Sequence, residues 1–221
     1  MAELSRMRGE GIEGKPRPLS PMGSARAGGK EATDLSPVDG LTLEHDLIRS
    51  VLRAMDGVVN RMASDRAMDP FRLVRIIDFV ETYAHRVHHG KEEEILFREL
   101  HEKDLEPAHR QTMEELAREH VEMRRLVGDL AEALEAHRDG NGEESLSAIR
   151  EALRGLTEIY PSHLEREEGE FFPAVEAYLG EDEMQVLMEA MAGHDRGVVH
   201  EKYGRLAETL AGRAEDWELR E

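Results

Sequence analysis

Six side chains recur along the chain in three pairs, and the two members of each pair are 75 residues apart. They are four imidazoles and two carboxylates: His45 and His120, His88 and His163, and Glu92 and Glu167. Imidazole nitrogens and carboxylate oxygens bind iron, zinc and manganese, and carboxylates from facing helices can hold two such ions together. The repeat therefore predicts a metal site that is shared between two halves of one fold.

The spacing within each half places these groups on common helix faces. A histidine precedes a glutamate by four residues, as in His88 and Glu92, so on a helix both side chains can face one centre. His45, which has no glutamate partner four residues later, shares its helix face with the apolar residues Ile48 and Leu52. The second half repeats this arrangement. Each half can therefore direct three ligands inward.

Each group taken alone has a simpler explanation. A lone histidine on an apolar face is more often a hydrogen-bonded core residue, and a lone His/Glu pair is more often a surface ion pair. The local sequences repeat together, however, EHDLIR (44–49) with EHVEMR (119–124) and HHGKEEEILF (88–97) with HLEREEGEFF (163–172), whereas the rest of the two halves matches poorly. Six inward polar groups in one layer would be costly unless a ligand satisfied them, which favours metal binding.

Two further histidines leave the register open. His89 and Glu93 also have the four-residue spacing, and His85 lies one turn before His88. Aligning the halves places His89 opposite Leu164, so we expect His89 to support the site from outside or to be exposed. An extra ligand is the alternative role for His89, as it is for His85. We expect His85 to lie within reach of the site.

The composition restricts the partners. The chain has 48 Asp and Glu against 29 Lys and Arg, a net charge of −19, which disfavours binding to nucleic acid or to an anionic membrane. It has no cysteine, which excludes thiolate ligands and disulfides. No apolar run reaches the roughly 18 residues that span a bilayer, and the first residues lack the apolar stretch of a secretory signal. We expect a cytoplasmic protein.

The chain divides into a tail and a helical domain. Residues 1–40 contain seven Gly and four Pro and few large apolar residues, so we expect a flexible N-terminal tail. The metal-binding bundle is expected over 41–212, and a short C-terminal tail over 213–221.

Helical periodicity and helix start signals predict the elements of the bundle. Asp69-Pro70 and Pro107 are typical helix starts, and Pro161 is expected to bend or break the fourth helix near Tyr160. The fold class is therefore all-α, an antiparallel four-helix bundle with additional C-terminal helices. The expected helices cover about 42–62, 69–100, 107–139 and 143–179, followed by 181–191 and 195–212.

The sequence resembles bacterial hemerythrin-like proteins, the family that carries the HHE cation-binding domain. The resemblance rests on EHD (44–46), HHGKEEEILF (88–97), EHVEMRR (119–125) and HLEREEGEFFP (163–173), and HEKYGRLAETL (200–210) resembles the C-terminal helix of one subgroup. It implies a non-haem centre of two iron ions, joined by an oxygen bridge, and a diatomic or peroxide ligand. The ligands that it implies are His45, His88, Glu92, His120, His163 and Glu167.

Two departures narrow the implied role. Oxygen-carrying hemerythrins have a second histidine one turn after the third-helix ligand, where this chain has Arg124, and an Asp ligand where this chain has Glu168. We therefore expect sensing, scavenging or buffering of O₂, NO, peroxide or iron rather than reversible O₂ carriage. A di-iron oxidoreductase, such as a peroxidase or NO-reducing enzyme, and a metal-free structural bundle remain the alternatives. His200 and Tyr203, three residues apart on the last expected helix, are candidates for an extra ligand or a hydrogen-bond donor.

Overall fold

The computed structural model describes residues 36–63 and 68–198, and these residues contain helices and no strand. Helix α1 spans Pro37–Ala63, and α5 spans Pro107–Arg138. The second and fourth long helices each contain wider π-helical segments. The second comprises α2 (Pro70–Phe79), η1 (Val80–His88), α3 (His89–Lys91), η2 (Glu92–Phe97) and α4 (Arg98–His101). The fourth comprises α6 (Gly142–Arg166), η3 (Glu167–Phe171), α7 (Phe172–Val175) and η4 (Glu176–Tyr178).

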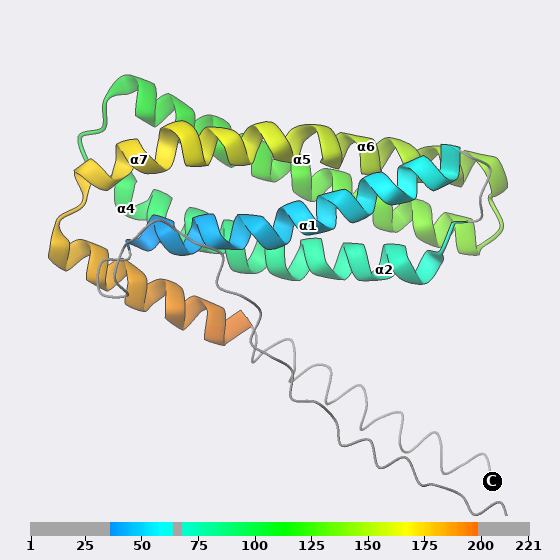
Figure 1. Ribbon diagram of the computed structural model, residues 1–221, viewed down its shortest axis with the longest axis horizontal. Coiled ribbons are helices and arrows are strands. Elements are labelled where there is room, and N and C mark those ends of the chain that lie inside the picture. The colour runs from blue at the N-terminus through cyan, green and yellow to red at the C-terminus, as the bar shows by residue number, and fades with distance from the viewer. Residues whose placement is uncertain (1–35, 64–67, 199–221) are drawn as a thin grey trace, which may run out of the picture. The chain divides into compact units, whose positions relative to one another are not determined.

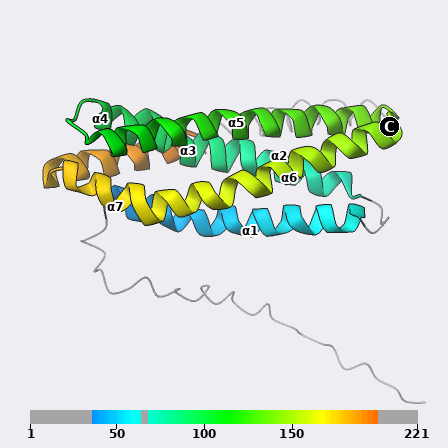
Figure 2. The same ribbon diagram turned by 90° about the horizontal axis from the view of Figure 1, so that it is seen from above.

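The four long helices pack as an antiparallel bundle. Helix α5 packs on α6, α1 packs on both α6 and η1, and α2 packs on α5, so each long helix has two neighbours. Figure 1 shows the helices running back and forth, and Figure 2 shows α6 between α5 and α1. The all-α bundle predicted from the sequence is confirmed.

Local signals explain where most of these helices begin and end. Asp69 accepts a hydrogen bond of 3.0 Å from the backbone N–H of Phe71, and Pro70 is the first helical residue. Pro107 starts α5 in the same way. Gly140 and Gly142 adopt φ values of 96° and 51°, which favour glycine, and they turn the chain from α5 into α6.

The first helix begins five residues before the expected start at Thr42. Ser36 and Asp39 form a reciprocal cap: the Ser36 N–H donates to Asp39 Oδ2 at 2.8 Å, and the Asp39 N–H donates to Ser36 Oγ at 3.3 Å. Pro37 follows at the first helical position. Val38 and Leu41 are buried in the first turns of this helix, so residues 36–41 are part of the bundle.

Two expected helix breaks are wrong. Helix α6 continues through Pro161, whose ring lies on the exposed side, while Tyr160 and His163 on either side of it are buried and hold the helix to the bundle. The helix after Gly180 runs without a break from 181 to 198. This helix contains glycine, which lowers the stability of a helix by only about 1 kcal/mol relative to alanine. The burial of Leu187 and Met191 offsets this loss.

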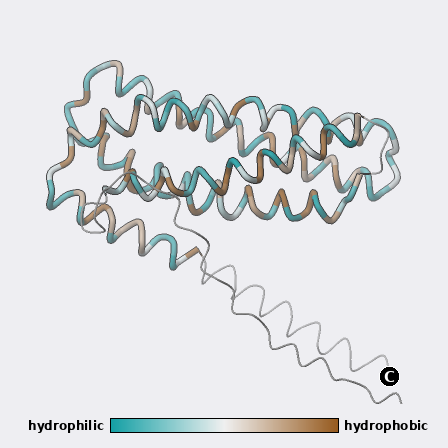
Figure 3. Tube along the Cα trace, in the orientation of Figure 1, coloured by the Kyte–Doolittle hydropathy of each residue, from teal (hydrophilic) through white to brown (hydrophobic). Residues whose placement is uncertain are grey.

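The core consists of two apolar clusters with a polar layer between them. One cluster, which we call the upper cluster, includes Met55, Leu73 and Leu130. The other, which we call the lower cluster, includes Leu96, Leu116 and other residues near α4 and α7. Figure 3 shows these apolar positions recurring along each helix. The buried layer between them contains His45, His85, His88, His89, Glu92, His120, His163 and Glu167.

Among the described residues, no helix is both long and apolar enough to cross a membrane. The last residues of the expected N-terminal tail, 36–40, belong to the bundle instead. Residues 1–35 and 213–221 lie outside the described residues, so the tails expected there stay predictions.

The helix start suggests a test by truncation. Deleting residues 1–34 removes no side chain of the described core, so the free energy of unfolding should remain within about 0.5 kcal/mol of that of the full chain. Deleting residues 1–41 also removes Val38 and Leu41, and each large buried apolar side chain contributes roughly 1.5–3 kcal/mol. Urea unfolding followed by circular dichroism measures both. Equal stability of the two truncated chains would contradict the position of the helix start.

Candidate metal centre

The bundle brings the six predicted ligands together in its interior. His45 on α1 and His88 on η1 place their Nε2 atoms 3.1 Å apart, and His120 on α5 and His163 on α6 do the same at 3.1 Å. All four imidazoles are fully buried. Each half-bundle therefore presents a pair of nitrogens to the centre.

The two glutamates span these histidine pairs. Glu167 places Oε1 3.0 Å from Nε2 of His163 and Oε2 3.4 Å from Nε2 of His45. Glu92 reaches Nε2 of His88 at 3.7 Å with Oε1 and Nε2 of His120 at 3.3 Å with Oε2. None of the four carboxylate oxygens has a hydrogen-bond partner of acceptable geometry. Buried carboxylates without hydrogen bonds are costly, and a bound cation would offset that cost.

The ligand atoms form two overlapping groups. In each group, one atom from every residue lies within 4.8 Å of the others: His45, His88, Glu92 and Glu167 in one, and His89, Glu92, His120 and His163 in the other. Glu92 belongs to both. This arrangement suits two cations that share a bridging carboxylate, and the nitrogen and oxygen donors suit iron, zinc or manganese.

His89 is buried in the centre, so the exposed position considered for it is wrong, and its placement in one ligand group is compatible with the role of an extra ligand. Its ring is fully buried and stacks on that of His120 with centroids 3.8 Å apart. Neither ring nitrogen has a hydrogen-bond partner, and burial lowers the pKa of His89 well below its usual value, which leaves a neutral imidazole. The repeat gave no signal for this residue because Leu164 occupies the matching position.

His85 lies beside the centre but outside both groups. Its ring stacks on that of His89 with centroids 5.3 Å apart, and its Nε2 has no hydrogen-bond partner. Burial and the nearby charge of Arg124 lower the pKa of His85 to about 4. His200 and Tyr203 lie outside the described residues, so their proposed contribution stays a prediction.

A ring of four outer carboxylates orients the four ligand histidines, and sequence reasoning missed it. The Nδ1 of each histidine lies 2.6–3.0 Å from a glutamate oxygen. Each glutamate belongs to the long helix that comes before the helix of its histidine in the chain, and the last helix supplies the glutamate for the first. Glu44 on α1 holds His88, for example, although its own sequence neighbour is His45. The remaining contacts close the circle: Glu93 to His120, Glu119 to His163, and Glu168 to His45.

Each outer carboxylate is paired with a cation, and this layer also repeats at 75 residues. Arg166 donates to Glu119 at 2.7 Å, Arg124 donates to Glu93 at 2.7 Å, and the other two pairs are Lys91 with Glu44 and Arg49 with Glu168. Burial alone would raise the pKa of each carboxylate, but these hydrogen bonds and charges lower all four. Ionised carboxylates at Nδ1 fix the tautomer that leaves Nε2 free to bind a metal.

The inner charges also influence one another. Burial opposes ionisation of His163, but the charge of Glu167 and the hydrogen bond to Glu119 raise the pKa of His163 to about 10. Burial likewise opposes ionisation of Glu167, but His163 and His45 lower its pKa well below the usual value. His163 and Glu167 thus stabilise each other's charged forms, and a bound cation would displace the proton of His163.

The π-helical segments coincide with the ligands. Segment η2 starts at Glu92 and η3 starts at Glu167, so the repeat extends to the backbone. A π-helical turn is wider than an α-helical turn and is frequent at functional sites. This widening occurs where the chain must direct both a ligand and the adjacent outer carboxylate, such as Glu92 and Glu93.

The two ends of the centre differ in polarity. Phe97 stacks on His120 with centroids 6.0 Å apart and Phe172 stacks on His45 at 5.9 Å, so aromatic rings close the side of the lower cluster. Tyr160, which matches His85 in the repeat, lies on the side of the upper cluster, and its buried hydroxyl has no hydrogen-bond partner.

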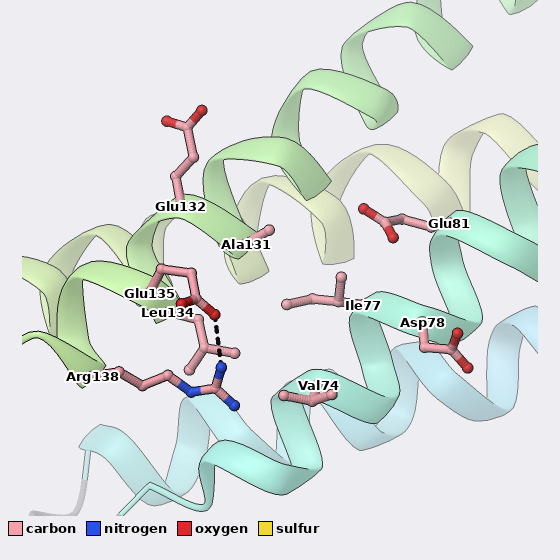
Figure 4. A pocket seen from close by; sticks show the side chains of 9 residues that line it. All are labelled: Val74, Ile77, Asp78, Glu81, Ala131, Glu132, Leu134, Glu135 and Arg138. Carbon is pink, nitrogen blue, oxygen red and sulfur yellow. Dashed lines mark hydrogen bonds and ion pairs between the residues drawn. The ribbon is translucent and has the colours of Figure 1, made fainter. Parts of the chain in front are cut away.

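One surface groove lies away from this centre. It runs between α2 and α5 and is lined by residues such as Val74, Ile77 and Arg138, as Figure 4 shows. A second hollow, lined in part by Arg49 and Glu168, approaches the centre from outside. Neither of these two hollows is lined by a predicted inner ligand, and the six predicted ligands are fully buried.

Replacing one outer carboxylate tests the ring. Glu119→Gln removes the charge that orients His163 but keeps the side-chain size, and loss of such a partner typically lowers metal affinity about 10- to 100-fold. Competition with a chelator measures the affinity for iron(II). Glu122→Gln is the control, because Glu122 is exposed and pairs with Arg125 on the outside of α5. Equal affinities of the two variants would contradict the role of the ring.

The family comparison agrees with this geometry. The model of the hemerythrin HHE cation-binding domain matches residues 36–175 and again residues 114–219, and the overlap is consistent with the repeated motif order of the two halves. Among curated proteins, none matches the chain. The first match spans the four helices and all six inner ligands. The chain therefore belongs to the hemerythrin family of HHE cation-binding domains.

Proposed function

We propose that the protein binds two iron ions in the bundle interior and uses them to sense, scavenge or buffer O₂, NO, peroxide or iron. The observation that supports this most directly is the pair of overlapping ligand groups, which share Glu92, together with four buried carboxylate oxygens that have no hydrogen-bond partner. A metal-free structural bundle would offer these oxygens only ion pairs with the neighbouring imidazoles, whereas a bound cation would offset their burial directly. The proposed ligands are His45, His88, Glu92, His120, His163 and Glu167, together with His89.

Iron is favoured by the donor set. The ligands are imidazoles and carboxylates without any thiolate, and a dinuclear site with bridging carboxylates is typical of iron in helix bundles. Two iron ions in such a site would supply redox chemistry and an open coordination position for a small molecule.

The surrounding residues would control what reaches the centre. The outer carboxylates hold the histidine rings in a fixed orientation, which limits the movement of their Nε2 atoms. Phe97 and Phe172 exclude water from one side. On the other side, the Tyr160 hydroxyl can donate a hydrogen bond to a small anion that enters the centre. This pattern suits a small ligand rather than an extended substrate.

Metal analysis tests the proposal. Protein purified without oxygen should contain about two iron ions per chain and should develop a visible absorption band on exposure to air. His88→Ala and His163→Ala should each lose at least half of the iron, because each removes one nitrogen from a different ligand group. The exposed His101→Ala is the matched control and should keep the full content. One zinc ion per chain without iron, or full occupancy in both ligand variants, would contradict the proposed centre.

The buried tyrosine allows a test of ligand binding that is separate from metal binding. Tyr160→Phe keeps the ring and removes only the hydroxyl, so the iron content should stay the same. One lost hydrogen bond is worth about 0.5–1.5 kcal/mol, so the azide dissociation constant should rise roughly 2- to 10-fold. Tyr83→Phe serves as the control, because Tyr83 stacks on Phe79 and belongs to neither ligand group. Unchanged azide affinity in Tyr160→Phe would place its hydroxyl outside the ligand pocket.

A further inference from the structure

The helix over 181–198 docks beside the metal centre. This helix, orange in Figure 1, lies outside the four long helices of the bundle. Leu187 and Met191 are buried in the lower apolar cluster, and Glu183 pairs with Lys103 near the end of α4. The helix is thus attached by both apolar and ionic contacts.

His194 on this helix contacts the backbone that precedes Glu92. His194 donates a hydrogen bond of 2.6 Å from Nε2 to the carbonyl oxygen of Arg86, in the π-helical segment that holds His88. A Cβ atom at Gly90 would lie only 2.6 Å from that same Nε2. The absence of a side chain at position 90 therefore lets the helix reach the segment that carries a metal ligand.

A chain of four side chains leads from this helix into the centre. Asp195 Oδ1 lies 3.0 Å from Nζ of Lys91, and Lys91 pairs with Glu44. The other oxygen of Glu44 lies 3.0 Å from Nδ1 of His88. Two ion pairs and one hydrogen bond thus connect the orientation of His88 to the helix over 181–198.

His163, which matches His88 in the other half, is supported differently. Arg166 replaces Lys91 and pairs with Glu119 and, at 3.5 Å, with Glu115 on α5. The Lys91 side chain is 5% exposed, whereas that of Arg166 is 25% exposed. Glu165 occupies the position that matches Gly90. Within the part of the chain that the structure describes, the contacts of the helix over 181–198 with the support of the centre therefore lie on the His88 side.

We propose that this helix positions His88, so that docking of the helix and metal binding at the centre strengthen each other. The inference rests on the proposed metal site. A helix that moves away would expose the Lys91–Glu44 pair to water and weaken its hold on His88. Because coupling between two equilibria is reciprocal, a metal that requires an oriented His88 would in turn stabilise the docked helix.

A steric variant and a charge variant separate the helix from the centre. Gly90→Ala adds a methyl group against His194 while favouring helical backbone, and Asp195→Asn removes the outer charge on Lys91. Gly169→Ala and Asp182→Asn are the matched controls: a Cβ at Gly169 meets no atom within 4 Å, and Asp182 is exposed on the same helix. All four are made in the full chain.

Two measurements report the coupling. Amide hydrogen exchange over 181–198 should slow at least several-fold when iron(II) is added to the wild-type chain, and this protection should be reduced in Gly90→Ala and Asp195→Asn. The release of iron(II) to a chelator should be about 10- to 100-fold faster for one of the two ions in these variants, as for loss of other ligand-orienting partners. The two controls should behave as wild type in both measurements.

The outcomes distinguish the two proposals. Iron binding with wild-type release rates in Gly90→Ala and Asp195→Asn, or helix exchange that iron does not alter, would overturn the coupling and leave the metal centre intact. A wild-type chain that binds no metal would overturn the proposed function and the coupling with it, and faster exchange of the helix in metal-free Gly90→Ala would then show only that Gly90 permits docking.

Discussion

The bundle interior depends on the hydrogen bonds between the four ligand histidines and the carboxylates of neighbouring helices. Burying imidazoles and carboxylates in one layer is costly unless each polar atom has a partner. The outer nitrogen of every ligand histidine meets a glutamate, and every such glutamate meets a cation. The outer Nδ1 atoms of these histidines therefore have hydrogen-bond partners. Their inner Nε2 atoms and the carboxylates of Glu92 and Glu167 face a common centre.

Because this ring passes through all four helices, it also fixes their relative register. Glu44 on α1 can meet His88 only if the two helices are aligned to within about one side-chain length. The same holds where Glu168 returns from η3 to His45 and closes the ring. The apolar clusters above and below supply non-directional stabilisation, whereas the ring selects one alignment from those that the apolar residues would tolerate.

The sequence predicted that the six inner side chains face one centre, because their spacing is visible in one dimension. His88 and Glu92 share a face at four residues, and the 75-residue interval repeats them. The outer partners repeat just as faithfully, yet a glutamate beside a ligand points toward another helix, and only the packed bundle shows that Glu44 serves His88. The exposed position considered for His89 is wrong for the opposite reason. It breaks the repeat, since Leu164 stands opposite, and its burial follows from packing on His120.

The departures from the repeat make the two sides of the centre unequal. His89 joins the group of His120 and His163 as a fifth imidazole, whereas the group of His45 and His88 has no such addition. Gly90, the next residue, admits the C-terminal helix on the His88 side. His89 and Gly90, two adjacent residues, thus make the two halves of an otherwise two-fold symmetric site different. A cation with three imidazole ligands and one with two would differ in affinity and in room for a small molecule, so a duplicated fold can provide two distinct metal positions without changing the ligands that repeat.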